Sequence, residues 1–142
     1  MKPDIVYPVI SFWSKVMDAC DDEGTLYGLS AREYMRWRRL ALVLDVIDSA
    51  GLGYAMTEPV PHQPSHAMGI FSWLLNERLS VEFTNIKELG PIPLDEFKTR
   101  VIANMKEDSE LYDADGNLYR RIADVTKARD HKAVIEVFRA FM

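Results

Sequence analysis

The stretch VEFTNIKELGP, Val81–Pro91, decides between two folds for this chain. As a strand, it would begin with Val81 and Phe83, which alternate with polar residues as in a half-buried β-strand. As a helix, it would use Val81, Ile86 and Leu89 to continue an apolar stripe, and its final glycine and proline would stop the helix. We favour the helical interpretation.

The helical interpretation extends toward the N-terminus. Ser65 can cap a helix, and a broad apolar face follows it, made of Ala67, Ile70, Phe71, Leu74, Leu75 and Leu79. The sequence therefore predicts one long helix, Ser65–Leu89.

A second predicted helix has the clearest start signal. Ser30-Ala31-Arg32-Glu33 reads as a capping box, in which a hydroxyl at the cap is followed three residues later by a carboxylate. Gly51 and Gly53 are typical of a helix stop. Apolar residues occupy most sides of the C-terminal half, so we expect this helix at the centre of the domain.

Three further segments have a single apolar face at helical spacing. We predict a helix over Ile5–Cys20, another after Pro93, and a last one capped by Asp130. Their apolar faces are Val9, Phe12, Trp13, Val16 and Cys20; Leu94, Phe97, Val101 and Met105; and Val134, Ile135, Phe138 and Phe141.

The stretch SELYDADGNLYRR, Ser109–Arg121, resembles a calcium loop in its alternating oxygen side chains. An EF-hand loop needs ligands at positions 1, 3, 5 and 12 and glycine at position 6. With Asp113 at position 1, position 6 is Leu118; with Gly116 at position 6, positions 1 and 12 are Leu111 and Ile122. Neither register supplies the ligand set, so we predict a β-hairpin near residues 110–120, with Gly116 at positive φ.

Together these segments predict a mainly α-helical bundle of about five helices with one small β-hairpin. The chain has 142 residues, of which 48% are hydrophobic and 27% charged. That composition predicts a single globular domain over residues 1–142. The short proline-rich piece Glu58–His66 is too short to separate two domains.

Charge and cysteine content narrow the function classes. A formal net charge of −5 disfavours general binding of nucleic acid through its phosphates. The single cysteine excludes an internal disulfide and suits a reducing compartment. The N-terminal stretch is a poor signal peptide, and no apolar run is long enough to span a bilayer. We therefore expect a cytoplasmic protein without membrane contact.

No phosphate-binding loop, nucleophile elbow, paired-cysteine site or HExxH motif is present in the sequence. We therefore predict no cofactor, metal or catalytic residue. Arg32, Arg36 and Arg39 share one helix face, which indicates a site for an anion or an acidic partner. In the alternative, acidic residues of the preceding segment pair with these arginines: Asp18, Asp21, Asp22 and Glu23.

A second candidate surface lies opposite the apolar face of the predicted long helix. It consists of His66, Gly69, Trp73 and Glu77, and an exposed tryptophan beside a glycine notch is typical of a protein-binding surface. Alternatively, another part of the chain covers Trp73.

Two other candidates are weaker. His62 and His66 lie close in sequence, but a metal site would need further ligands, for example Glu58 or Glu77. Cys20 falls on an apolar stripe, which indicates a packed residue rather than a nucleophile.

Three function classes stay open. The first is a protein-binding domain, most concretely a toxin inhibitor or immunity-type protein that occludes a toxin or enzyme. The second is a hydrolase or metal-dependent enzyme with a dispersed site of His62, His66 and a carboxylate. The third is an adaptor or chaperone that binds a peptide or helix in a groove. We favour the first, because surface complementarity needs no catalytic motif.

Overall fold

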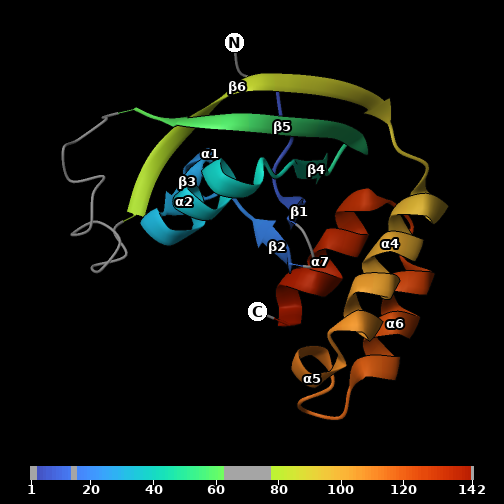
Figure 1. Ribbon diagram of the computed structural model, residues 1–142. Helices are drawn as coiled ribbons and strands as arrows, with labels where there is room; N and C mark the ends of the chain where they lie inside the picture. The colour runs from blue at the N-terminus through green and yellow to red at the C-terminus, as the bar shows by residue number, and fades with distance from the viewer. Residues whose placement is uncertain (1–2, 14–15, 63–77, 142) are drawn as a thin grey trace.

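The computed structural model describes residues 3–13, 16–62 and 78–141. It is a mixed α/β fold built on a six-stranded antiparallel sheet with strand order β2-β1-β4-β5-β6-β3 (Figure 1). The strands are β1 Val9–Trp13, β2 Val16–Cys20, β3 Gly28–Ser30, β4 Leu44–Asp48, β5 Leu52–Pro61 and β6 Arg78–Pro91. The helices are α1 Glu23–Leu26, α2 Ala31–Leu40, α4 Leu94–Glu107, α5 Ser109–Tyr112, α6 Leu118–Lys127 and α7 His131–Phe141. The predicted mainly α-helical bundle is therefore wrong.

The sheet is covered by helices on both faces, and each face has its own hydrophobic core. One core joins α1 and α2 to the sheet and includes Trp37, Val46 and Phe83. The other joins α4, α5, α6 and α7 to the opposite face and includes Ile10 and Phe97. In Figure 1 the two groups of helices lie on either side of β1, β2 and β4.

This two-sided burial explains why the predicted helix over Ile5–Cys20 is wrong. In β1, Val9 faces the α1/α2 core, whereas Ile10 and Phe12 face the other core. A strand buried on both faces loses the polar alternation of a half-exposed strand and reads as a nearly continuous apolar run. Such a run cannot be told from a buried helix by periodicity alone.

The predicted helix that begins at Ser30 is half right. The capping box is confirmed, because the Glu33 backbone N–H donates to Ser30 Oγ at 3.2 Å and the Ser30 N–H donates to the Glu33 carboxylate at 3.3 Å. The helix ends at Leu40, where Ala41 adopts a left-handed conformation with φ of 50°. The apolar residues beyond it form β4, buried on both faces like β1.

The predicted helix Ser65–Leu89 is wrong over residues 78–89, which belong to β6; residues 63–77 lie outside the described ranges. Val81 and Phe83 are buried, as expected for alternation, but the next inward residue is Ile86, three positions on. Across from this step, Glu58 of β5 has a φ of +57°. Because of the three-residue step from Phe83 to Ile86, the inward-facing residues of β6 have a spacing that resembles a helix.

The C-terminal predictions fare better. The predicted helices after Pro93 and Asp130 are confirmed as α4 and α7. The predicted hairpin near residues 110–120 is wrong, because α5 and α6 flank the turn instead. Gly116 has a positive φ of 76°, as predicted. The turn was therefore predicted correctly, but the segments on either side of it are helices rather than strands.

Candidate functional site

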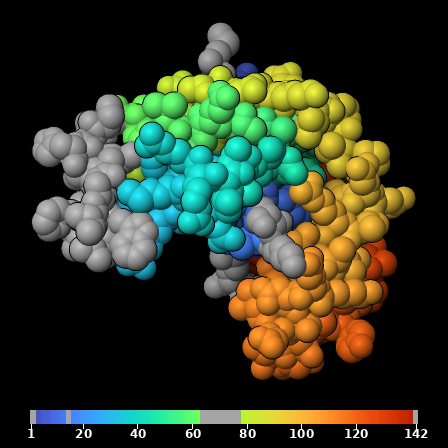
Figure 2. Space-filling view, in the orientation of Figure 1, coloured from blue at the N-terminus to red at the C-terminus, as the bar shows by residue number. Residues whose placement is uncertain are grey.

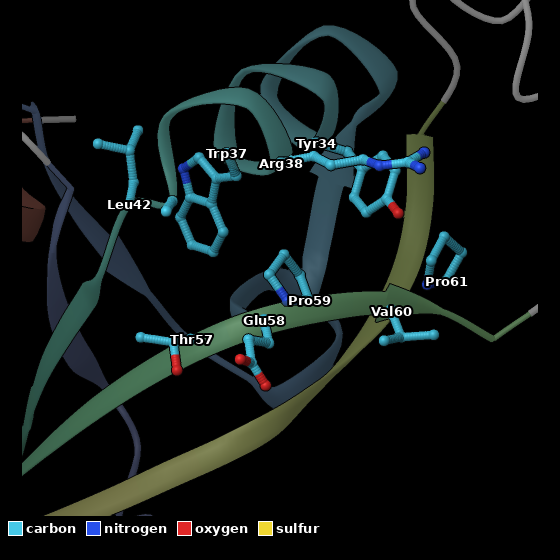
Figure 3. Close-up of a pocket in the computed structure, with 10 residues that line it drawn as sticks. Tyr34, Trp37, Arg38, Leu42, Thr57, Glu58, Pro59, Val60 and Pro61 are labelled. Carbon is cyan, nitrogen blue, oxygen red and sulfur yellow. The ribbon is translucent and has the colours of Figure 1, made fainter.

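A groove lies between α2 and β5 on the α1/α2 side, with a volume of about 840 Å³ (Figure 3). Five of its lining residues come from α2 and the connection that follows it: Tyr34, Trp37, Arg38, Ala41 and Leu42. The other five are consecutive residues of β5: Thr57, Glu58, Pro59, Val60 and Pro61. In the space-filling view, the surface of α2 and its connection to β4 lies against β5 (Figure 2).

The groove exists because β4 is shorter than β5. The two strands pair only as far as Leu44 and Met56. Beyond Met56, within the described part of the chain, α2 rather than a strand lies beside this edge of β5. Pro59 and Pro61 have no backbone N–H, so this edge offers few donors to an added strand.

The floor of the groove is aromatic and firmly supported. Trp37 and Tyr34 are only 2% and 8% exposed. The Trp37 ring packs against Trp13 and Phe83, with ring centroids 5.3 Å away in each case. Figure 3 shows the six-membered ring of Trp37 turned toward β5. A floor held in this way loses little side-chain freedom when a ligand binds, which favours affinity.

Two charged residues and an exposed valine line the open side. Glu58 is held by Thr84, whose hydroxyl donates to the Glu58 backbone carbonyl and carboxylate, both at 3.1 Å. The Arg38 guanidinium extends along the groove above Tyr34 (Figure 3). Val60 is 48% exposed, so the wall on the β5 side presents apolar surface to solvent.

The predicted arginine face lies beside the groove. Arg32, Arg36 and Arg39 are all exposed on α2. The Arg36 guanidinium lies over the Trp13 ring, 5.2 Å from its centroid. Whether these three residues bind an anion stays a prediction.

Two acidic residues proposed as partners for that face have other roles. Asp21 forms an ion pair with Arg139 at 2.7 Å, and Asp22 caps α1 by accepting from the Thr25 N–H at 2.8 Å. The N-cap hydrogen bonds hold the pKa of the Asp22 carboxyl below its usual range.

Sequence reasoning missed Arg38, which borders the groove. The predicted arginine face has the spacing i, i+4 and i+7 from Arg32, and this spacing leaves out residue 38. Tyr34, Trp37 and Arg38 lie at i, i+3 and i+4, which places them on a second face of α2. This face could have been predicted from the sequence.

The other sequence-based site is not placed by the structure. His66, Gly69, Trp73 and Glu77 lie outside the described residues, and their role in partner binding stays a prediction. His62 is exposed. Within residues 3–13, 16–62 and 78–141, no three histidine, cysteine or acidic side chains gather where they could hold a metal ion. None of the described helices has the length and apolar character needed to cross a membrane.

Comparisons of the chain with protein-family models, with curated proteins and with solved structures found no match.

Proposed function

We propose that this protein is a protein-binding domain that holds an extended, acidic segment of a partner in the groove between α2 and β5. The observation that carries the proposal is the combination of an aromatic floor with Arg38 at the rim and three further exposed arginines on the same helix. The floor of Tyr34, Trp37 and Pro61 suits apolar side chains, and burial of such anchors supplies most of the affinity at protein interfaces.

Charge argues for an acidic occupant. The chain has a net charge of −5, yet α2 alone has four arginines: Arg32, Arg36, Arg38 and Arg39. Among the described residues, no carboxylate lies within ion-pair distance of Arg38. A guanidinium binds a carboxylate through two parallel hydrogen bonds, so Arg38 is suited to an acidic residue next to an apolar anchor.

Occlusion of a toxin or enzyme in the cytoplasm, as by an inhibitor or immunity-type protein, is the concrete form of this function that we propose. It requires a complementary surface and no catalytic group. The groove is one such surface, and the exposed arginines around it would speed association with an acidic partner.

The experiment is a selection of random peptides displayed on phage against the purified protein. Enriched peptides are then titrated against wild type and three variants. Arg38→Glu reverses a charge at the rim, Val60→Glu places a like charge on the exposed wall, and Arg120→Glu is a matched control on the exposed surface of α6.

We expect the enriched peptides to combine acidic with aromatic or aliphatic residues. Arg38→Glu and Val60→Glu should each weaken them by about 2 kcal/mol, roughly 30-fold in Kd, and Arg120→Glu should leave Kd unchanged. Peptides without acidic enrichment, or equal loss of affinity in all three variants, would overturn the proposal.

A further inference from the structure

A second cavity, of about 250 Å³, lies between α2, β2 and β3. Trp37 borders both this cavity and the groove, so the two are neighbours. The volume is below the roughly 300–1,000 Å³ of pockets for drug-sized ligands. The cavity therefore suits a smaller molecule.

Two tryptophan rings, those of Trp13 and Trp37, border this cavity. The indole N–H groups of Trp13 and Trp37 are buried, and neither has an acceptor among the described residues. Trp37 is only 2% exposed, so bulk water does not reach its ring freely. The two rings therefore give the cavity an aromatic wall, and their buried N–H groups are sensitive to changes beside them.

The opening of the cavity has charges of both signs that do not pair with one another. Asp18, Glu33 and Arg78 all line it. Burial and then the nearby Glu33 carboxylate raise the pKa of Asp18, while Arg78 acts in the opposite direction. Yet no ion pair joins Arg78 to Asp18 or to Glu33 within this described region. The three groups are close enough to influence one another but leave room between them.

Gly28 allows Arg78 to take its place at the opening. A Cβ on residue 28 would lie 2.8 Å from the Gly24 carbonyl oxygen and 3.0 Å from the Arg78 guanidinium. The guanidinium therefore rests against bare backbone at one side of the opening.

We propose that this cavity binds a small zwitterion of the α-amino-acid type. The ammonium group of the ligand lies between the Asp18 and Glu33 carboxylates. Its carboxylate faces Arg78. Opposite charges on one small molecule match the opposite charges at the opening, and a ligand with one charge alone would leave part of the site unpaired.

The test follows the indole N–H signals by nitrogen-15 NMR while each of the twenty free amino acids is added to the intact protein. A Trp73→Phe variant assigns the third tryptophan signal. Each amino acid that shifts the signals is compared with its methyl ester and with the analogue that lacks the amino group. The variants are Asp18→Asn and Arg78→Gln, with Arg38→Gln in the groove as the matched control.

The single cysteine gives a second, independent reading. Cys20 lines the cavity and is the only thiol of the chain, so its reaction rate with a thiol reagent reports directly on occupancy. A ligand in the cavity should slow that reaction along the same isotherm as the NMR shifts.

We expect at least one amino acid to shift the Trp13 and Trp37 signals saturably. Its ester and its deaminated analogue, and the variants Asp18→Asn and Arg78→Gln, should each bind at least tenfold more weakly than the parent pair, a loss of about 1.4 kcal/mol. Arg38→Gln should bind as wild type does. The proposal is overturned if no amino acid gives a saturable shift, if the ester binds as tightly as its parent, or if Arg78→Gln retains full affinity. None of these outcomes bears on peptide binding in the groove.

Discussion

Asp48, the last residue of β4, is a polar side chain in the interior on which the surrounding backbone depends. It is 0% exposed. Its Oδ1 accepts from the Ala50 and Leu52 N–H groups at 3.0 and 2.9 Å, and its Oδ2 accepts from the Val6 N–H at 3.1 Å. One carboxylate thus fixes both the turn from β4 to β5 and the segment that precedes β1. We expect Asp48→Ala to leave three donors without this partner.

The size of the effect follows from those three bonds. A hydrogen bond to a charged group contributes about 1.5–3 kcal/mol, and removal of the buried charge offsets part of the loss. We therefore expect Asp48→Ala to lower the free energy of unfolding by about 4 kcal/mol. At about 3 °C per kcal/mol for a domain of this size, Tm should fall by about 12 °C.

Asp48→Asn is the matched control, because it has the same shape. Its amide oxygen can keep the bonds to Ala50 and Leu52, while its NH₂ group meets the Val6 N–H donor to donor. It should cost about 2 kcal/mol, half the effect of alanine. Urea unfolding of the three proteins, followed by circular dichroism, gives the comparison if the m-value is unchanged. A loss below about 1 kcal/mol for alanine, or equal losses for both variants, would refute the reasoning.

Three further predictions concern single side chains. Ser30→Ala removes the α2 cap and should lower the free energy of unfolding by about 1 kcal/mol in urea titrations; no change would mean that the cap is dispensable. Hydrogen bonds from Arg121 hold the pKa of the Asp115 carboxyl well below its usual range, so the pair stabilises the fold above about pH 4 and this contribution is lost as pH falls further. Asp115→Asn should therefore lower Tm at neutral pH and match wild type in strong acid, and a Tm difference that persists in acid would contradict this. Burial raises the pKa of the Cys20 thiol to about 11, so a thiol reagent should modify the native protein far more slowly than the urea-unfolded chain, and equal rates would show that Cys20 is accessible.

The elements that the sequence predicted correctly are those with local signals. The start of α2 follows from a capping box within four residues, and α4 and α7 each bury one amphipathic face. The strands were missed because their signal depends on the rest of the fold. The residues of β1 and β4 alone do not indicate that helices cover both faces of the sheet.

The groove could be predicted only in part from the sequence, for the same reason. The sequence indicated the neighbouring arginine face of α2 but not the groove residues Tyr34, Trp37 and Arg38. On the β5 side it indicated only a short proline-rich piece. Pro59 and Pro61 are tolerated in β5 because that edge has no strand partner in the described structure. This tolerance can be recognised only once β4 is known to begin at Leu44, so that β4 does not pair with β5 beyond Met56.

If a peptide binds in the groove as we propose, the two prolines also affect how its sequence is selected. A sheet edge with free N–H groups fixes both the direction and the register of a peptide, because each main-chain donor must meet a carbonyl. At Pro59 and Pro61 the backbone has no such donor, so selection falls to side-chain shape and to the charge of Arg38. The carbonyl oxygens of Pro59 and Pro61 can still accept, so fewer main-chain bonds would orient a bound peptide here than at an ordinary sheet edge.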